Sequence, residues 1–137
     1  MTQIDVFYEG DLSTRSVHSD NGAEVLTDAP KDNQGLGRVF SPTDLFAASV
    51  ASCMLTLMGI GAKKLQVDIK GTKASVTKEM AQAPVRRIGK LKIEIVCPVR
   101  PSEEVIAKLI SLAETCPVKK SLHPDIVVEC SYRWGTS

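Results

Sequence analysis

The chain has 137 residues, of which 43% are hydrophobic, 24% are charged and only 4% are aromatic, and its formal net charge is +1. This length suits a single domain over residues 1–137 with a core large enough to fold alone. The near-neutral charge and the scarcity of aromatic side chains argue against nucleic-acid binding. The polar, acidic start MTQIDVFYEG is no secretory signal, so a cytoplasmic protein with reduced cysteines is expected.

Turn-forming residues dominate the stretch from residue 8 to residue 38. The segment SDNG (Ser19 to Gly22) is a strong turn signal between two short apolar pieces, which predicts a β-hairpin. The following segment DAPKDNQGLG (Asp28 to Gly37) reads as a long surface loop.

A long helix is predicted to begin after Ser41, which can act as its N-cap. Pro42 fits the first helical position, and Asp44 stands where a capping box places its acid. Residues 45–62 contain no charge, and the glycines and lysines of 59–64 suit a helix C-terminus.

The uncharged stretch of this helix is long enough to span a membrane, but serine, threonine and glycine residues dilute it within an ordinary soluble composition. No membrane association is therefore predicted. A helix that is apolar on all sides must be covered by protein on all sides. A domain this small does so most easily when two copies pack together.

The second half of the chain is predicted to form strands around another helix. Strand patterns occupy 72–80, 90–97 and 125–134, with a hairpin connection over 83–90 between the first two. A helix opens at Ser102, with an apolar face of Ile106, Leu109, Ile110 and Ala113. We therefore expect an α+β domain with antiparallel strands, in which Cys97 and Cys130 point into the core.

Two cysteines remain that could do chemistry. Cys53 lies about three turns inside the long helix, too deep for the helix N-terminus to lower the pKa of its thiol, so a functional Cys53 needs a cation or donor from elsewhere. Cys116 precedes Pro117 and two lysines, which predicts an N-cap cysteine with a lowered pKa. On local chemistry alone, Cys116 is the better thiolate.

Metal and cofactor sites are not predicted. The sequence has no C-x-x-C motif, its two histidines, His18 and His123, are isolated, and no glycine-rich phosphate loop is present.

Two motifs of the chain, SPTDLFAASVASCM and CPVKKSLHPDI, resemble the OsmC/Ohr family, the osmotically induced and organic hydroperoxide resistance proteins. The resemblance extends over most of the chain. It implies the OsmC-like fold, an intertwined homodimer with long central helices buried inside. It also implies reduction of organic hydroperoxides without a cofactor, with Cys53 as the attacking (peroxidatic) thiol, Cys116 as the resolving thiol, and a dithiol or lipoyl group as the reductant.

The family activates its attacking thiol with an arginine and a glutamate. The glutamate position aligns with Thr43 in this chain, a departure from the family motif, and the adjacent Asp44 is the alternative acid. Arg15 and Arg38 are the candidate arginines. Because local chemistry favours Cys116 and the resemblance favours Cys53, both assignments of the attacking thiol stay open here.

Two other functions fit the same residues. The chain could form a non-catalytic dimer that binds a small apolar or thiol-bearing ligand, with the cysteines serving as packing. It could also act as a redox sensor whose Cys53–Cys116 disulfide alters the binding of a partner.

Overall fold

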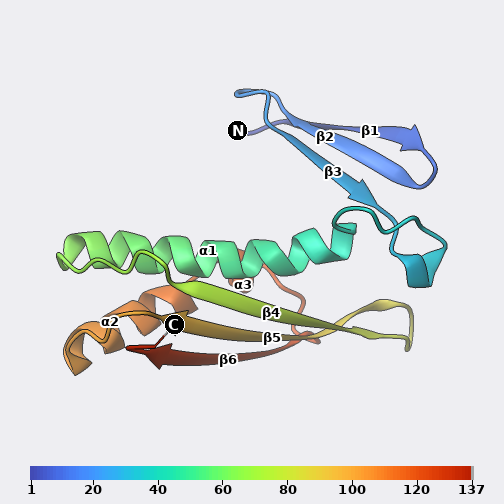
Figure 1. Ribbon diagram of the computed structural model, residues 1–137. Helices are drawn as coiled ribbons and strands as arrows, with labels where there is room; N and C mark the ends of the chain where they lie inside the picture. The colour runs from blue at the N-terminus through green and yellow to red at the C-terminus, as the bar shows by residue number, and fades with distance from the viewer. Residues whose placement is uncertain (137) are drawn as a thin grey trace. The chain divides into compact units, whose positions relative to one another are not determined.

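The computed structural model describes residues 1–136 and divides the chain into two packing units. The first unit comprises residues 1–46 and the second begins at Ala47. Figure 1 shows the helices and strands of both units. Two packing units are compatible with one domain, so the single domain over residues 1–137 stays a prediction.

The N-terminal unit is an antiparallel sheet of three strands joined by two hairpins. Its strands β1 (Ile4–Gly10), β2 (Ser13–His18) and β3 (Glu24–Asp28) follow the order β1-β2-β3. The hairpin predicted around SDNG is confirmed, because it joins β2 to β3. The predicted loop from Asp28 to Gly37 contains one short 3-10 turn, η1 (Lys31–Asn33).

Helix α1 (Pro42–Lys64) begins and ends with local hydrogen bonds. The predicted capping box is present: Ser41 N–H donates to Asp44 Oδ2 at 2.9 Å, and Asp44 N–H donates to Ser41 Oγ at 3.1 Å. At the other end, Val67 N–H donates to Ala62 O at 2.9 Å. Gln66 adopts a left-handed conformation, as in a Schellman motif that ends a helix.

The second sheet contains strands β4 (Lys73–Ala81), β5 (Arg87–Cys97) and β6 (Val127–Trp134) in the order β4-β5-β6. β4 and β5 form the predicted antiparallel hairpin, but β6 runs parallel to β5. The expectation of purely antiparallel strands is therefore wrong. The reason is the connection from β5 to β6, which passes through two helices and returns the chain to the start of the sheet.

Those two helices are α2 (Glu103–Glu114), capped by Ser102 as predicted, and the short α3 (Pro117–Lys120). They share a core with α1 and one face of the sheet (Figure 1). The fully or almost fully buried members of that core are Ala47, Val50, Met54, Met58, Ile88, Leu91, Ile93, Ile95, Ala113 and Cys116. The opposite face of β5 is polar, with Lys92 and Glu94 exposed.

Gly61 explains how closely α1 and α2 approach. A Cβ atom at this position would lie 2.4 Å from Leu112 Cδ1 and 3.2 Å from Leu109 Cδ2. Any larger residue would require the Leu112 side chain to shift, so this glycine is a packing residue rather than a helix terminator.

Among residues 1–136, α1 is the one helix long and apolar enough to cross a membrane by length and composition. This is weak evidence, because the core helix of a soluble protein has the same features. Within the second unit, α1 contributes Val50, Met54 and Met58 to the buried core.

Candidate functional site

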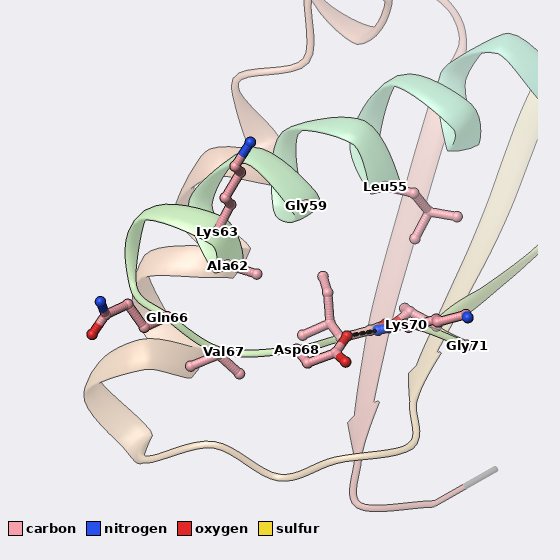
Figure 2. A pocket seen from close by; sticks show the side chains of 11 residues that line it. Leu55, Gly59, Ala62, Lys63, Gln66, Val67, Asp68, Lys70 and Gly71 are labelled. Carbon is pink, nitrogen blue, oxygen red and sulfur yellow. Dashed lines mark hydrogen bonds between the residues drawn. The ribbon is translucent and has the colours of Figure 1, made fainter.

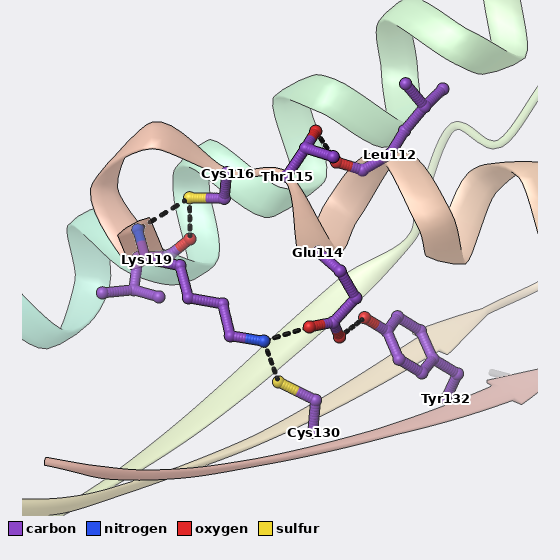
Figure 3. A network of polar contacts seen from close by, with 8 residues as sticks. Leu112, Glu114, Thr115, Cys116, Lys119, Cys130 and Tyr132 are labelled. Carbon is purple, nitrogen blue, oxygen red and sulfur yellow. Dashed lines mark hydrogen bonds and ion pairs between the residues drawn. The ribbon is translucent and has the colours of Figure 1, made fainter. Parts of the chain in front are cut away.

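Cys116 is buried at the start of α3. Its side chain is 0% exposed, and it forms the predicted N-cap, with Sγ accepting a hydrogen bond from Lys119 N–H at 3.3 Å. The same thiol donates to the carbonyl oxygen of Val50 at 3.8 Å (Figure 3). The sulfur of Cys116 therefore contacts α1 through Val50 and α3 through Lys119.

Cys53 lies on the same helix, one turn beyond Val50, and is half-buried. Its thiol lies close enough to that of Cys116 to raise the pKa of Cys116. Two thiols far apart in the sequence are thus direct neighbours, and both are reduced in this structure. They differ in access, because within this chain solvent reaches Cys53 but not Cys116.

The predicted lowering of the Cys116 pKa is wrong. Burial raises the pKa of this thiol, and the hydrogen bond with Cys53 raises it further. The backbone N–H donors of Lys119 and Val118 oppose the shift but do not reverse it. The N-cap geometry was predicted correctly, but the sequence did not reveal that the sulfur is fully buried. Cys116 is therefore a protonated thiol at neutral pH.

A polar network extends from Cys116 to the sheet, and sequence analysis missed it. Lys119 Nζ forms an ion pair with Glu114 Oε2 and lies 4.0 Å from Cys130 Sγ. Tyr132 Oη donates to Glu114 Oε1 at 2.8 Å (Figure 3). The available signal was the alternation along the last strand, which places Cys130 and Tyr132 on its inward face.

The charged groups of this network have shifted pKa values. Burial acts to raise the pKa of Glu114, but hydrogen bonds from Lys119 and Tyr132 outweigh it and lower the pKa overall. Burial and the hydrogen bond to Glu114 raise the pKa of Tyr132. Burial also raises the pKa of Cys130, against the attraction of Lys119. At neutral pH Glu114 is therefore a carboxylate, Tyr132 a phenol and Cys130 a neutral thiol.

The other two cysteines, Cys97 and Cys130, lie on strands and differ in burial. Cys97 is 0% exposed, which confirms its predicted place in the core. Cys130 is half-buried and packs against the core cluster, so its inward direction is confirmed. Cys130 lies beside a charged side chain, 4.0 Å from Lys119 Nζ.

Arg15, one candidate arginine, is engaged within the N-terminal sheet. Its Nε atom donates to Glu9 Oε1 at 2.6 Å, and Nη1 lies 3.2 Å from Glu24 Oε1. The guanidinium group also stacks on Phe7, 4.8 Å from the ring centre.

Arg38, the other candidate, is paired with the buried carboxylate of Asp28. Its Nε donates to Asp28 Oδ2 at 2.9 Å, and its Nη2 donates to Asp28 Oδ1 at 3.0 Å. Ser13 Oγ donates to the same carboxylate. The hydrogen bonds from Arg38 and then Ser13 hold the pKa of Asp28 far below its usual range.

Thr43 Oγ1 lies 3.2 Å from Ser41 Oγ, beside the capping box that Asp44 completes. The roles of Arg15, Arg38 and Asp44 in activating a thiol stay predictions.

The surface of the described residues is hollowed in several places, of which two are relevant here. One, of about 610 Å³, lies where α1 ends and is lined by residues from Leu55 to Thr72 (Figure 2). The other, of about 470 Å³, lies in the N-terminal unit beside Asp28 and Arg38. No group of three or more histidine, cysteine or acidic side chains in residues 1–136 is placed to hold a metal ion.

Comparison with known proteins places this geometry in a family. The model of the OsmC-like protein family matches residues 35–131. A Psychrobacter arcticus structure, assigned to the osmotic stress induced and detoxification response proteins, is 47% identical, with 96% of each chain covered and a TM-score of 0.91. No curated protein matches the chain.

More distant structures share the fold. An organic hydroperoxide resistance protein OsmC from Legionella pneumophila is 15% identical, with 97% of this chain and 96% of that chain covered and a TM-score of 0.77. An organic hydroperoxide resistance protein from Elizabethkingia anophelis is 18% identical, with coverage of 98% and 96% and a TM-score of 0.76. From the family match and the 47% identical relative, the chain belongs to the OsmC-like protein family.

Proposed function

We propose that this protein reduces organic hydroperoxides in the cytoplasm with a pair of cysteines. The observation that supports this most directly is the contact between Cys53 and Cys116, two reduced thiols with unequal access to solvent. The half-buried Cys53 can meet a substrate, so it is the attacking thiol. The buried, protonated Cys116 is the resolving thiol, because it can meet only its neighbour.

The chemistry takes three steps. The Cys53 thiolate attacks the terminal oxygen of the peroxide, the O–O bond breaks, and Cys53 becomes a sulfenic acid, while the leaving alkoxide takes up a proton from solvent to form the alcohol. The sulfur of Cys116 then attacks the sulfur of Cys53, and the sulfenic oxygen leaves as water with the proton of the Cys116 thiol. A dithiol or a lipoyl group returns the resulting disulfide to two thiols and is itself oxidised to a disulfide. No metal or organic cofactor is required.

A cation near Cys53 completes the proposal, because an apolar setting alone keeps a thiol protonated. Arg15 and Arg38 are the proposed sources, with Asp44 as an acid in place of the family glutamate. Both arginines are already held by carboxylates, an arrangement that fixes the direction of a guanidinium group.

We also propose that the active form is a homodimer in which a second copy covers α1. One face of this helix carries Ser49, Ser52, Thr56 and Ile60, all exposed, and the Ile60 side chain is 48% exposed. Their spacing places them on the same side of the helix as Cys53. The small serine and threonine side chains on this face allow a second helix to approach closely. Ile60→Lys should therefore yield monomers, measured by light scattering, whereas an unchanged molar mass would contradict this assembly.

The first experiment is intact-mass analysis after one equivalent of cumene hydroperoxide, with hydrogen peroxide in a parallel sample. We expect a loss of two mass units, mapped by digestion to Cys53 and Cys116 and faster with the organic peroxide. Cys53→Ser should abolish the reaction. Cys97→Ala is the matched control, since Cys97 is buried in the sheet and should leave the reaction unchanged.

Other outcomes select the other functions. Unchanged mass with both peroxides would rule out peroxide reduction and favour a dimer that binds a small ligand. Formation of the disulfide without rapid recycling by any dithiol would favour a redox sensor. Recycling by dihydrolipoamide at a steady rate would support the enzyme.

A further inference from the structure

The short helix α3 carries Cys116 but has little structure of its own. It contains four residues, a single turn, and none of them is fully buried. One isolated helical turn is unstable because fixing its backbone costs more than its few hydrogen bonds return. The position of the resolving thiol therefore depends on what anchors α3 to the rest of the unit.

Lys119 connects Cys116 to that anchor. Its backbone N–H donates to Cys116 Sγ at 3.3 Å, while its side chain forms the ion pair with Glu114 at the end of α2. The Lys119 side chain is only 21% exposed, so this ion pair is shielded from solvent on one side. A partly buried pair of this kind restrains position more than an exposed one does.

Tyr132 fixes the other end of the network. Its hydroxyl donates to Glu114 at 2.8 Å from strand β6, and Tyr132 lies opposite Ile95 of the central strand β5. Contacts thus run without a break from the sheet through Tyr132, Glu114 and Lys119 to the sulfur of Cys116 (Figure 3).

We propose that Glu114, Lys119 and Tyr132 are positioning residues that hold Cys116 ready to resolve the sulfenic acid of Cys53, and thereby protect Cys53 from further oxidation. Two reactions compete for this sulfenic acid. Attack by Cys116 gives the disulfide and water, whereas a second peroxide molecule gives a sulfinic acid and an alcohol. A misplaced Cys116 slows only the first reaction. This inference rests on the proposed peroxide reduction.

The test separates the two steps of the reaction in Glu114→Gln and Tyr132→Phe. Rapid mixing with cumene hydroperoxide, followed by quenching and mass spectrometry, gives the rate of Cys53 oxidation, the rate of disulfide formation and the sulfinic fraction at Cys53. We expect disulfide formation to slow by ~10-fold and the sulfinic fraction to rise accordingly, since small misplacements of reacting groups have effects of this size. The rate of the first oxidation step should stay within about twofold of the wild-type rate, because the hydrogen bonds of Glu114 and Tyr132 join them to each other and to Lys119 rather than to Cys53.

Glu104→Gln is the matched control, because it is the same substitution in the same helix. Glu104 forms an exposed pair with Lys108 at 3.2 Å and touches nothing in the network. This variant should keep the wild-type rates of both steps. Lys119→Arg should retain most of the resolving rate, since it keeps a cation for Glu114, whereas Lys119→Met should not.

The outcomes distinguish this inference from the function on which it rests. Wild-type protein that forms neither sulfenic acid nor disulfide would overturn the proposed function itself. Wild-type protein that forms the disulfide as fast as both variants would overturn only the positioning role. Circular dichroism and thermal melting check that each variant folds, and Tyr132→Phe, which removes one hydroxyl group, serves if Glu114→Gln does not fold.

Discussion

The two sheets of this protein each have three strands, but they bury their side chains very differently within the chain. In β4–β6, one face packs against helices, and Leu91, Ile93 and Ile95 are at most 1% exposed. In β1–β3, large apolar side chains stay exposed, including Ile4, Val6, Phe7, Tyr8 and Leu26. Both sheets have strand-like sequences, so strand propensity alone does not separate them.

The two sheets are therefore stabilised by different interactions within the chain. Burial of apolar surface stabilises the second sheet, at roughly 25 cal/mol per Å². The first sheet relies within its own chain on hydrogen bonds and ion pairs, above all the Asp28–Arg38 pair. Exposed apolar patches of this kind mark surfaces that meet another protein, which agrees with the proposed homodimer.

The largest expected effect is the loss of a core side chain from the second sheet. Leu91→Ala should lower the free energy of unfolding by ~2–5 kcal/mol, because it leaves a cavity beneath the helices. Leu26→Ala, the matched change in the first sheet, removes a side chain that is 53% exposed and should cost far less. Urea denaturation at several protein concentrations measures both. A large, concentration-dependent cost for Leu26→Ala would show that a second copy covers this residue.

Overpacking between α1 and α2 should have the next largest effect. Gly61→Val should destabilise the protein by ~1–3 kcal/mol more than Gly59→Val, since only Gly61 lies against Leu112 and Leu109. Apart from its chain neighbours and the backbone of its own helix, no atom of residues 1–136 lies within 4 Å of a Cβ atom at Gly59. Because both variants place valine in the same helix, thermal melting compares them with equal helix propensity. Equal melting temperatures would mean that α2 moves freely to make room.

A smaller effect, which depends on pH, is expected in the first sheet. Hydrogen bonds from Arg38 lower the folded-state pKa of Asp28, so its stabilising effect is complete above the unfolded value of about 3.9 and is lost as the pH falls below it. Asp28→Asn should therefore be less stable than wild type at pH 7, and the difference should shrink in acid. Melting temperatures measured from pH 2 to pH 7 test this. A difference that is constant across that range would contradict the assignment.

The smallest effect is expected on the exposed face of the second sheet. Lys90 Nζ lies 3.2 Å from Glu129 and 4.0 Å from Glu79, both of them well exposed. Lys90→Met should change the free energy of unfolding by less than about 1 kcal/mol, as for most surface ion pairs. Urea denaturation in low and high salt checks this. A larger loss would mean that polar contacts also contribute substantially to this sheet.

Much of the fold follows from local signals in the sequence. Capping residues at Ser41 and Ser102 predicted both major helix starts, and alternation predicted the inward face of β5. The direction of β6 did not follow, since its residues alternate identically whether it pairs parallel or antiparallel. Strand direction depends on the path of the intervening helices, which no local pattern encodes.

The site was predictable to a similar degree. The two motifs identified Cys53 and Cys116, and the N-cap position of Cys116 followed from Pro117. The direction of the Cys116 pKa shift did not follow, because it depends on burial beneath α1. The Glu114–Lys119–Tyr132 network was missed because Tyr132 lies beside Glu114 only when β6 has paired with β5.

The parallel pairing of β5 with β6 has a consequence for how the chain folds during synthesis. The hairpins of β1–β3 join neighbouring segments and can form as soon as those residues leave the ribosome. The second sheet must wait, because its last strand follows the α2–α3 crossover and pairs with residues made much earlier. Contacts between distant segments form slowly, so the edge of β5 that pairs with β6 stays unpaired for longest. We therefore expect slow synthesis or early termination before Val127 to expose the protein to aggregation and chaperone binding.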